Sequence, residues 1–128
     1  MSHQCRLSFA NINFLSPQIA EVIVDNNVTI SLEMAEEYER FLNENFSSNF
    51  GLLINKINHY DYAYEAKLSI ASSANIKAMA VVTYAKADLD KTNNLMEERR
   101  VDQWNLRTFS GLELGWQQAK SWLEQQLI

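Results

Sequence analysis

Two unbroken runs of apolar residues constrain the fold of this 128-residue chain more than any other feature. One is the run 52–54 (Leu-Leu-Ile) inside Phe50–Ile57, and the other is the run 78–82 inside Ile76–Tyr84. A strand that is apolar at consecutive positions has both faces buried, as in a parallel sheet covered by helices. We therefore predict that these two segments are neighbouring inner strands of one sheet.

The segment Ser31–Phe46 has the periodicity of an amphipathic helix. Ser31 suits the N-cap, because its hydroxyl can accept a hydrogen bond from a free amide of the first turn. Glu33 and Glu36 follow it, where the helix dipole favours negative charge. The apolar face, which we expect to pack on the sheet, consists of Met34, Ala35, Tyr38, Phe41, Leu42 and Phe46.

Weaker patterns predict the remaining helices and an edge strand. We expect helices at Tyr64–Ser72 and Ala87–Arg100, and a strand near a sheet edge at Trp104–Phe109. Ser110 and Glu113 have the spacing of a capping box, which predicts the start of a last helix. The core-facing stripe of that helix is Leu112, Trp116, Ala119, Leu123 and Leu127.

Short strands are predicted in the first thirty residues. Cys5–Phe9 alternates weakly between polar and apolar residues, and Ile19–Val24 is rich in β-branched residues. Asparagine tolerates positive φ, and residues 25–27 contain two asparagines. We therefore predict a hairpin turn there, joining Ile19–Val24 to Val28–Ile30.

The order of these elements predicts an α/β fold. A helix follows each strand from the second onward, which requires crossover connections and hence a mostly parallel sheet. We expect a mixed sheet of about four or five strands, with an N-terminal β-hairpin and about four helices packed on it. Only three glycines and one proline occur, so long linkers are not expected and residues 1–128 are interpreted as a single domain.

Composition argues against several classes of function. The net charge of −5 disfavours contact with phosphate backbones, so we do not expect nucleic acid as a partner. The lone cysteine, Cys5, excludes an internal disulfide. Residues 1–10 lack a secretory signal pattern, and no run approaches the ~20 apolar residues of a transmembrane helix. We expect a cytoplasmic protein.

Taken together, the predicted hairpin, the helix Ser31–Phe46, the strand 51–55 and the ending from Phe109 to Leu123 resemble STAS domains. More closely, they resemble the stage II sporulation protein AA-like branch, also described as STAS/SEC14-like bacterial proteins. The resemblance implies an anti-sigma-factor antagonist-like fold, no cofactor, and binding of a kinase-like protein partner. It also implies a switch by phosphorylation of a serine where the helix after the central strand begins. Residues 49–68 contain no serine or threonine, so that switch cannot be assigned to any position.

The corresponding strand-to-helix loop is the candidate partner-binding site. It is unusually rich in aromatic and titratable residues: His59, Tyr60, Asp61, Tyr62 and Tyr64. Partners and ligands bind at the carboxyl ends of strands in open α/β sheets. In the alternative interpretation Asp61 caps the following helix, while the tyrosine rings cover the end of the sheet. A further hypothesis is that the charge of Asp61 mimics a phosphoserine.

Other aromatic residues are candidates for a ligand site or an interface, namely Phe41, Phe46, Trp116 and Trp122. No nucleophile elbow and no phosphate-binding glycine loop occurs, so no catalytic residue is assigned and we do not expect an enzyme. His3, Cys5 and His59 are too few and too scattered for a structural metal site.

Three functions follow as hypotheses. The first is a non-catalytic regulatory or protein-interaction domain that binds its partner through the loop His59–Tyr64. The second is a carrier of a small apolar, lipid-like ligand, held in a pocket of about 300 Å³ or more that is lined by residues such as Phe41, Leu42, Phe46 and Trp116. The third is a domain that self-associates, for example as a homodimer, through Trp122 or an open edge at Trp104–Phe109.

Overall fold

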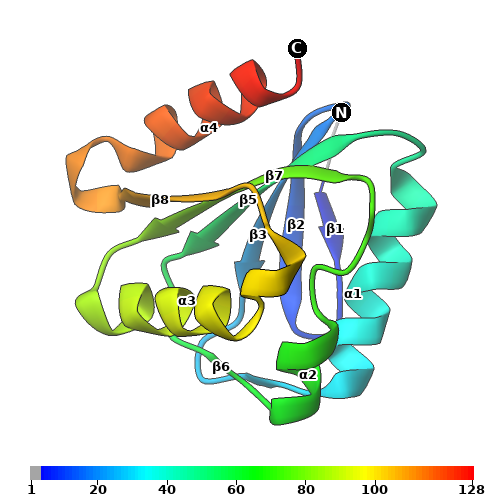
Figure 1. The fold of residues 1–128 in the computed structure, drawn as a ribbon, viewed down its shortest axis with the longest axis vertical. Coiled ribbons are helices and arrows are strands. Elements are labelled where there is room, and N and C mark those ends of the chain that lie inside the picture. The colour runs from blue at the N-terminus through cyan, green and yellow to red at the C-terminus, as the bar shows by residue number, and fades with distance from the viewer. Residues whose placement is uncertain (1–3) are drawn as a thin grey trace.

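Six strands form one mixed sheet in the computed structural model, which describes residues 4–128 (Figure 1). Their order across the sheet is β1-β2-β3-β5-β7-β8. The first two pairings are antiparallel and the other three are parallel. The α/β prediction is therefore confirmed, with one strand more than expected. The strands are β1 (Gln4–Arg6), β2 (Ala10–Ser16), β3 (Ile19–Val24), β5 (Phe50–Lys56), β7 (Ile76–Thr83) and β8 (Leu106–Ser110).

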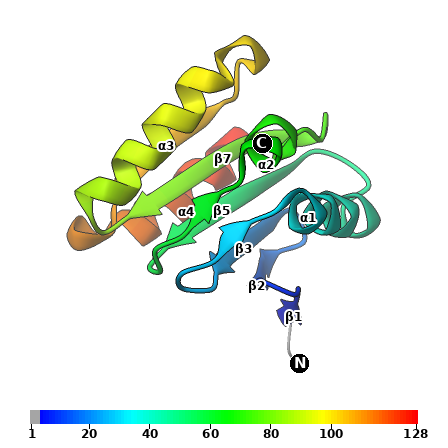
Figure 2. The ribbon, with the colours of Figure 1, turned by 90° about the horizontal axis from the view of Figure 1, so that it is seen from below.

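Four α-helices cover the two faces of this sheet (Figures 1 and 2). One face carries α1 (Leu32–Asn45), α2 (Tyr64–Ser69) and α3 (Lys86–Glu98), and the other carries α4 (Gly115–Gln126). Two short 3₁₀ turns, η1 (Arg100–Asp102) and η2 (Gly111–Glu113), precede β8 and α4. Within residues 4–128, no helix combines the length and the hydropathy that crossing a bilayer requires.

The two predicted inner strands are neighbours and are buried on both faces. Alternate side chains of β5 point to opposite sides, so Leu52 packs in the core beneath α1 while Leu53 packs against α4. In β7, Met79 likewise packs in the core beneath α1, and Ala80 packs in the core beneath α4. The two apolar runs were therefore interpreted correctly, and they separate two hydrophobic cores.

The predicted N-terminal hairpin has the wrong partner strand. β3 pairs antiparallel with β2, with Val22 opposite Ile12, and the chain turns at residues 17–18. A strand buried on both faces needs a long partner, and β2 offers seven residues, whereas Val28–Ile30 offers three. The segment after β3 forms β4 (Thr29–Ile30), which pairs with β6 (Asp61–Tyr62) in a separate two-stranded sheet. Asn27 does adopt positive φ, at 64°.

Helix starts differ from the predictions at two places, whereas α1 begins as expected. The Ser31 hydroxyl accepts a 3.2 Å hydrogen bond from the Met34 amide. Asp61 does not cap α2, because it lies in β6 and α2 begins after Ala63. Ser110 caps only η2, since Leu114 has a φ of 62° and breaks the helix before α4.

Three further details of the predicted elements differ in the structure. Leu112 lies in η2 and is 77% exposed, so it does not belong to the core-facing stripe of α4. The predicted helix Tyr64–Ser72 ends at Ser69, and the first strand covers Gln4–Arg6 rather than Cys5–Phe9.

Candidate functional site

The most unusual chemistry of the chain lies where β5 ends. Lys56 is the last residue of β5 and follows Leu52 and Ile54 at alternate positions, so its side chain lies on the face covered by α1, α2 and α3. The carboxyl ends of parallel strands are the usual location of binding sites in α/β folds. The segment that leaves β5 here is the predicted loop His59–Tyr64.

A cavity of about 60 Å³ lies between this face of the sheet, the helices α1 and α3, and the loop that follows α2. Its walls are mainly apolar, and half-buried Tyr62, Ala71 and Trp104 are among its lining residues. The volume is about twice the ~30 Å³ that one water molecule occupies in the liquid. The polar residues that line it include Lys56, Tyr38, Tyr60, Tyr62 and Thr92.

Lys56 has no ionic partner in this cavity. The residue is only 4% exposed, and its Nζ lies 5.1 Å from the ring centroid of Tyr60 and 5.8 Å from that of Tyr62. Across residues 4–128 its ammonium meets no hydrogen-bond acceptor and no carboxylate within 4.0 Å. Burial lowers the pKa of Lys56 from 10.5 to about 8, and the more distant Asp88 opposes part of that shift.

Three tyrosines line the same cavity, and burial favours the neutral form of each. Burial raises the pKa of Tyr38 and of Tyr60 well above the ordinary value, and it also raises the pKa of Tyr62. The hydroxyls of Tyr60 and Tyr62 are close enough to influence each other. In the described part of the chain, the Tyr38 hydroxyl has no hydrogen-bond partner, although the residue is only 4% exposed. Two buried residues that line the cavity, Lys56 and Tyr38, thus carry a polar group that makes no hydrogen bond to the described chain.

Polar contacts tie α3 to the segment that follows β5. Asp88, in the first turn of α3, is buried and its Oδ2 lies 2.8 Å from Nδ1 of His59. Lys91 forms an ion pair of 3.0 Å with Asp61 and donates to the Tyr60 carbonyl at 3.3 Å. These contacts hold the segment 59–61, which includes the cavity-lining Tyr60, against α3.

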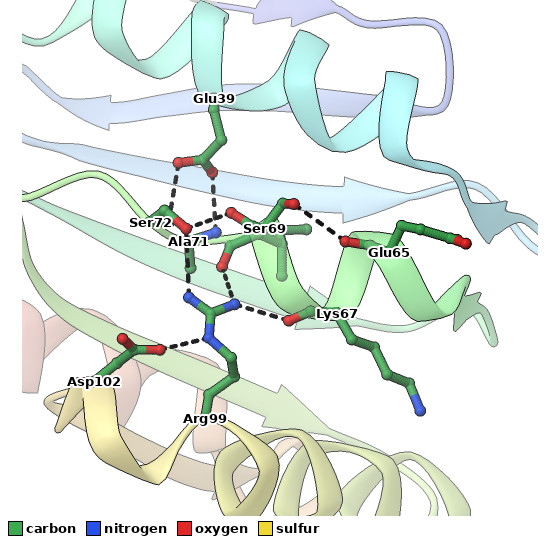
Figure 3. A network of polar contacts seen from close by, with 9 residues as sticks. Glu39, Glu65, Lys67, Ser69, Ala71, Ser72, Arg99 and Asp102 are labelled. Carbon is green, nitrogen blue, oxygen red and sulfur yellow. Dashed lines mark hydrogen bonds and ion pairs between the residues drawn. The ribbon is translucent and has the colours of Figure 1, made fainter.

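A second polar network joins the other end of α3 to α1 and to the loop after α2 (Figure 3). Arg99 donates to the carbonyls of Lys67 and Ile70 at 2.8 and 2.7 Å. Glu39, in α1, accepts hydrogen bonds from three successive backbone amides of this loop, those of Ala71, Ser72 and Ser73, at 3.0 to 3.2 Å. Because it satisfies backbone groups of a turn, we assign this network to the fold rather than to function.

The structure divides the predicted partner-binding residues between the surface and the interior. His59 and Asp61 contact α3, and the His59 side chain is 61% exposed. Tyr60 and Tyr62 line the cavity instead, and Tyr60 is buried. Tyr64, at the start of α2, is 69% exposed.

The structure does not bring Phe41, Leu42, Phe46 and Trp116 together, because they lie on opposite faces of the sheet. Phe41, Leu42 and Phe46 pack in the core beneath α1, where Phe46 stacks on Phe50 with ring centroids 4.2 Å apart. Trp116 and Trp122 pack on the α4 side, where Trp122 contacts Phe109.

Sequence reasoning missed Lys56, Tyr38 and Asp88. A signal for Lys56 existed, since it continues the alternation Leu52, Ile54 on one face of a strand predicted to be buried on both sides. Tyr38 was assigned correctly to the apolar face of its helix, but only the fold shows that this residue lines a cavity.

Residues 4–128 contain no group of three or more His, Cys, Asp or Glu side chains that could hold a metal ion, and His3 lies outside the described residues. Comparisons of the chain with protein-family models, curated proteins and solved structures give no match. The resemblance to STAS domains therefore stays a prediction.

Proposed function

We propose that the chain is a non-catalytic binding domain whose cavity beneath α1, α2 and α3 receives a small ligand. The observation that carries this proposal is the buried, unpaired ammonium of Lys56. Buried charges in proteins are almost always paired, because burying an unpaired charge lowers the stability of the fold by roughly several kcal/mol. A bound group that pairs with Lys56 would explain why a lysine occupies an otherwise apolar strand face.

The size of the cavity refines the hypothesis of an apolar carrier. A cavity of about 60 Å³ is far below the ~300 Å³ of sites that hold drug-sized ligands. The proposed ligand is therefore a few heavy atoms long rather than a lipid chain.

Methyl NMR tests this proposal. Small acids, amines, alcohols and neutral hydrocarbons would each be titrated to millimolar concentration into protein with ¹³C-labelled methyl groups. We expect at least one compound class to shift the methyl resonances of Val22, Met79 and Val81, which line the cavity, while Leu53 on the α4 side stays unchanged. If no class moves the cavity methyls, the proposal is wrong.

A second candidate function, binding of a protein partner, is favoured by exposed apolar side chains along the segment 57–68. Ile57 is 51%, Tyr64 69% and Leu68 55% exposed, and Tyr64 and Leu68 are four residues apart along α2. Exposed aromatic residues of this kind are common anchors in protein interfaces.

A pull-down from native lysate with variants at exposed residues tests this candidate. Tyr60 is buried, so replacing it would disturb the core, whereas Tyr64→Ala and Leu68→Ala remove only exposed groups. We expect the double variant to lose a partner that the wild type captures, and Val101→Ala, at a residue 86% exposed in η1, to retain it. Equal recovery by all three proteins would contradict an interface at this segment.

A further inference from the structure

We propose that the ligand is a small aliphatic monocarboxylate, with its carboxylate paired to the Lys56 ammonium and its alkyl group against the apolar wall. This inference rests on the proposed function and specifies the chemistry of its ligand. Nothing else in the described chain supplies a counter-ion to Lys56, and ion pairs with charged hydrogen bonds are the strongest polar contacts available in such a site.

The charges around the cavity favour a ligand with one negative charge. Asp88 and Lys91 of α3 and Asp61 of β6 all influence Lys56, but each already has a partner. His59 is the partner of Asp88, and Lys91 is the partner of Asp61. Among these groups, Lys56 alone has no hydrogen-bonded or ionic partner in the described chain, so a dianion such as phosphate would bring an uncompensated charge into an apolar site.

The tyrosines that line the cavity also suit a carboxylate ligand, because their hydroxyls can donate hydrogen bonds. The Tyr38 hydroxyl, from α1, has no partner within residues 4–128, and burial keeps all three cavity tyrosines neutral. Neutral phenols donate hydrogen bonds to a carboxylate without adding charge. An amine ligand, in contrast, would place a second cation beside Lys56.

The apolar wall and the volume limit the alkyl part. Val22, Ile54, Met79, Val81 and Leu95 line the cavity. An engineered cavity of ~150 Å³ holds the six carbons of benzene, so a cavity of about 60 Å³ suits an alkyl group of about two to three carbons, and the carboxylate would lie toward the side where the cavity is open. Isobutyrate has an alkyl group of this size and is the probe that we choose.

The decisive comparison is between isobutyrate and isobutyramide, which have nearly the same shape but differ in charge. We expect the wild-type protein at pH 7 to bind isobutyrate at least ~10-fold more tightly than the amide, as followed by the cavity methyl resonances, because only the acid forms a hydrogen bond between two charged groups with Lys56. Inorganic phosphate should shift these resonances no more than the amide does. Equal affinity for acid and amide, or stronger binding of phosphate, would overturn the inference.

Two variants locate the charge that recognises the acid. Lys56→Met keeps an unbranched side chain as far as Cε and removes the ammonium, and we expect it to lower isobutyrate affinity at least ~10-fold while the amide is unaffected. Lys120→Met, on α4 across the sheet, is the matched control and should bind as the wild type does. Unchanged isobutyrate binding by Lys56→Met would also overturn the inference.

The outcomes separate this inference from the proposed function. If neutral compounds shift the cavity methyl resonances but isobutyrate binds no more tightly than isobutyramide, the proposed binding function stands and the inference of a carboxylate ligand is wrong. If no compound reaches these methyls, both are wrong. The comparison of acid with amide uses only wild-type protein, so it holds even if a variant is unstable.

Discussion

The ammonium of Lys56 lies over the aromatic face of Tyr60, 5.1 Å from the ring centroid, and this face replaces a counter-ion. A cation–π contact contributes about 0.5–2 kcal/mol, whereas burying an ammonium costs several kcal/mol (roughly). Lys56 therefore destabilises the ligand-free fold. A residue that costs stability and sits in a cavity is a candidate for function, because stability is commonly traded for activity at binding sites.

Lys56→Met should stabilise the ligand-free protein. Methionine fits the same space without a charge to desolvate, so we expect the free energy of unfolding at pH 7 to rise by about 1–3 kcal/mol. Urea denaturation followed by tryptophan fluorescence measures this difference. Lys120→Met, at the partly exposed surface of α4, should change it by less than about 0.5 kcal/mol. A destabilised Lys56→Met protein would mean that the ammonium has a favourable partner.

The stability of the wild-type protein should rise with pH above neutrality. The pKa of Lys56 is about 8 in the folded protein and 10.5 when unperturbed, so between these values the unfolded chain binds more protons. Stability rises with pH wherever the unfolded state binds more protons, by up to roughly 3 kcal/mol for this shift.

The difference between the wild type and Lys56→Met isolates this effect. The raised pKa values of Tyr38 and Tyr60 lower stability only above about pH 10, and they act in both proteins. We expect the stability gap between the two proteins to narrow steadily from pH 7.5 to pH 9.5. A constant gap would show that Lys56 keeps an ordinary pKa.

Local sequence patterns predicted the inner part of the fold well. The alternation on both faces of β5 and β7 depends only on hydrophobic periodicity, and the N-cap of α1 depends only on the contact between Ser31 and Met34. Such features arise within one segment, so one sequence is sufficient to predict them.

Pairings between distant segments could not be predicted in this way. Thr29–Ile30 looked like the second arm of a hairpin, yet it pairs with Asp61–Tyr62, about thirty residues later. The cavity is harder still, because its lining comes from four strands of the main sheet, two helices and several loops. Only the fold brings Tyr38 of α1 and Lys56 of β5 to the same cavity.

On the other face of the sheet, Trp116→Phe should destabilise the protein. The Trp116 indole donates a 2.8 Å hydrogen bond to the buried carboxylate of Glu21, which also accepts from Asn55 at 3.0 Å and from Asn13 at 2.9 Å. Loss of one donor to a buried charge costs about 1–3 kcal/mol. Trp122→Phe removes an indole that makes no hydrogen bond within the described chain, and it should cost less in the same denaturation experiment. Equal losses in the free energy of unfolding of the two variants would mean that the hydrogen bond to Glu21 contributes nothing and that only the packing of Trp116 matters.

Glu39→Gln should loosen the loop after α2 without unfolding the protein. Its carboxylate accepts from three backbone amides, and an amide side chain offers one acceptor oxygen in place of two. We expect hydrogen exchange at Ala71, Ser72 and Ser73 to accelerate about 10-fold or more, corresponding to about 1.4 kcal/mol of local stability. Glu36→Gln, on the exposed side of α1, is the control. Unchanged exchange at these amides would contradict the assigned role of Glu39.

The most direct test of the account is an NMR titration of the Lys56 side chain in the presence and absence of isobutyrate. Without the acid, we expect its ¹⁵Nζ or ¹³Cε resonance to titrate with a pKa of about 8. With saturating isobutyrate the pKa should move upward, because the carboxylate stabilises the ammonium. A pKa near 10.5 in both samples would place Lys56 in water and contradict the buried, unpaired cation on which the proposed site depends.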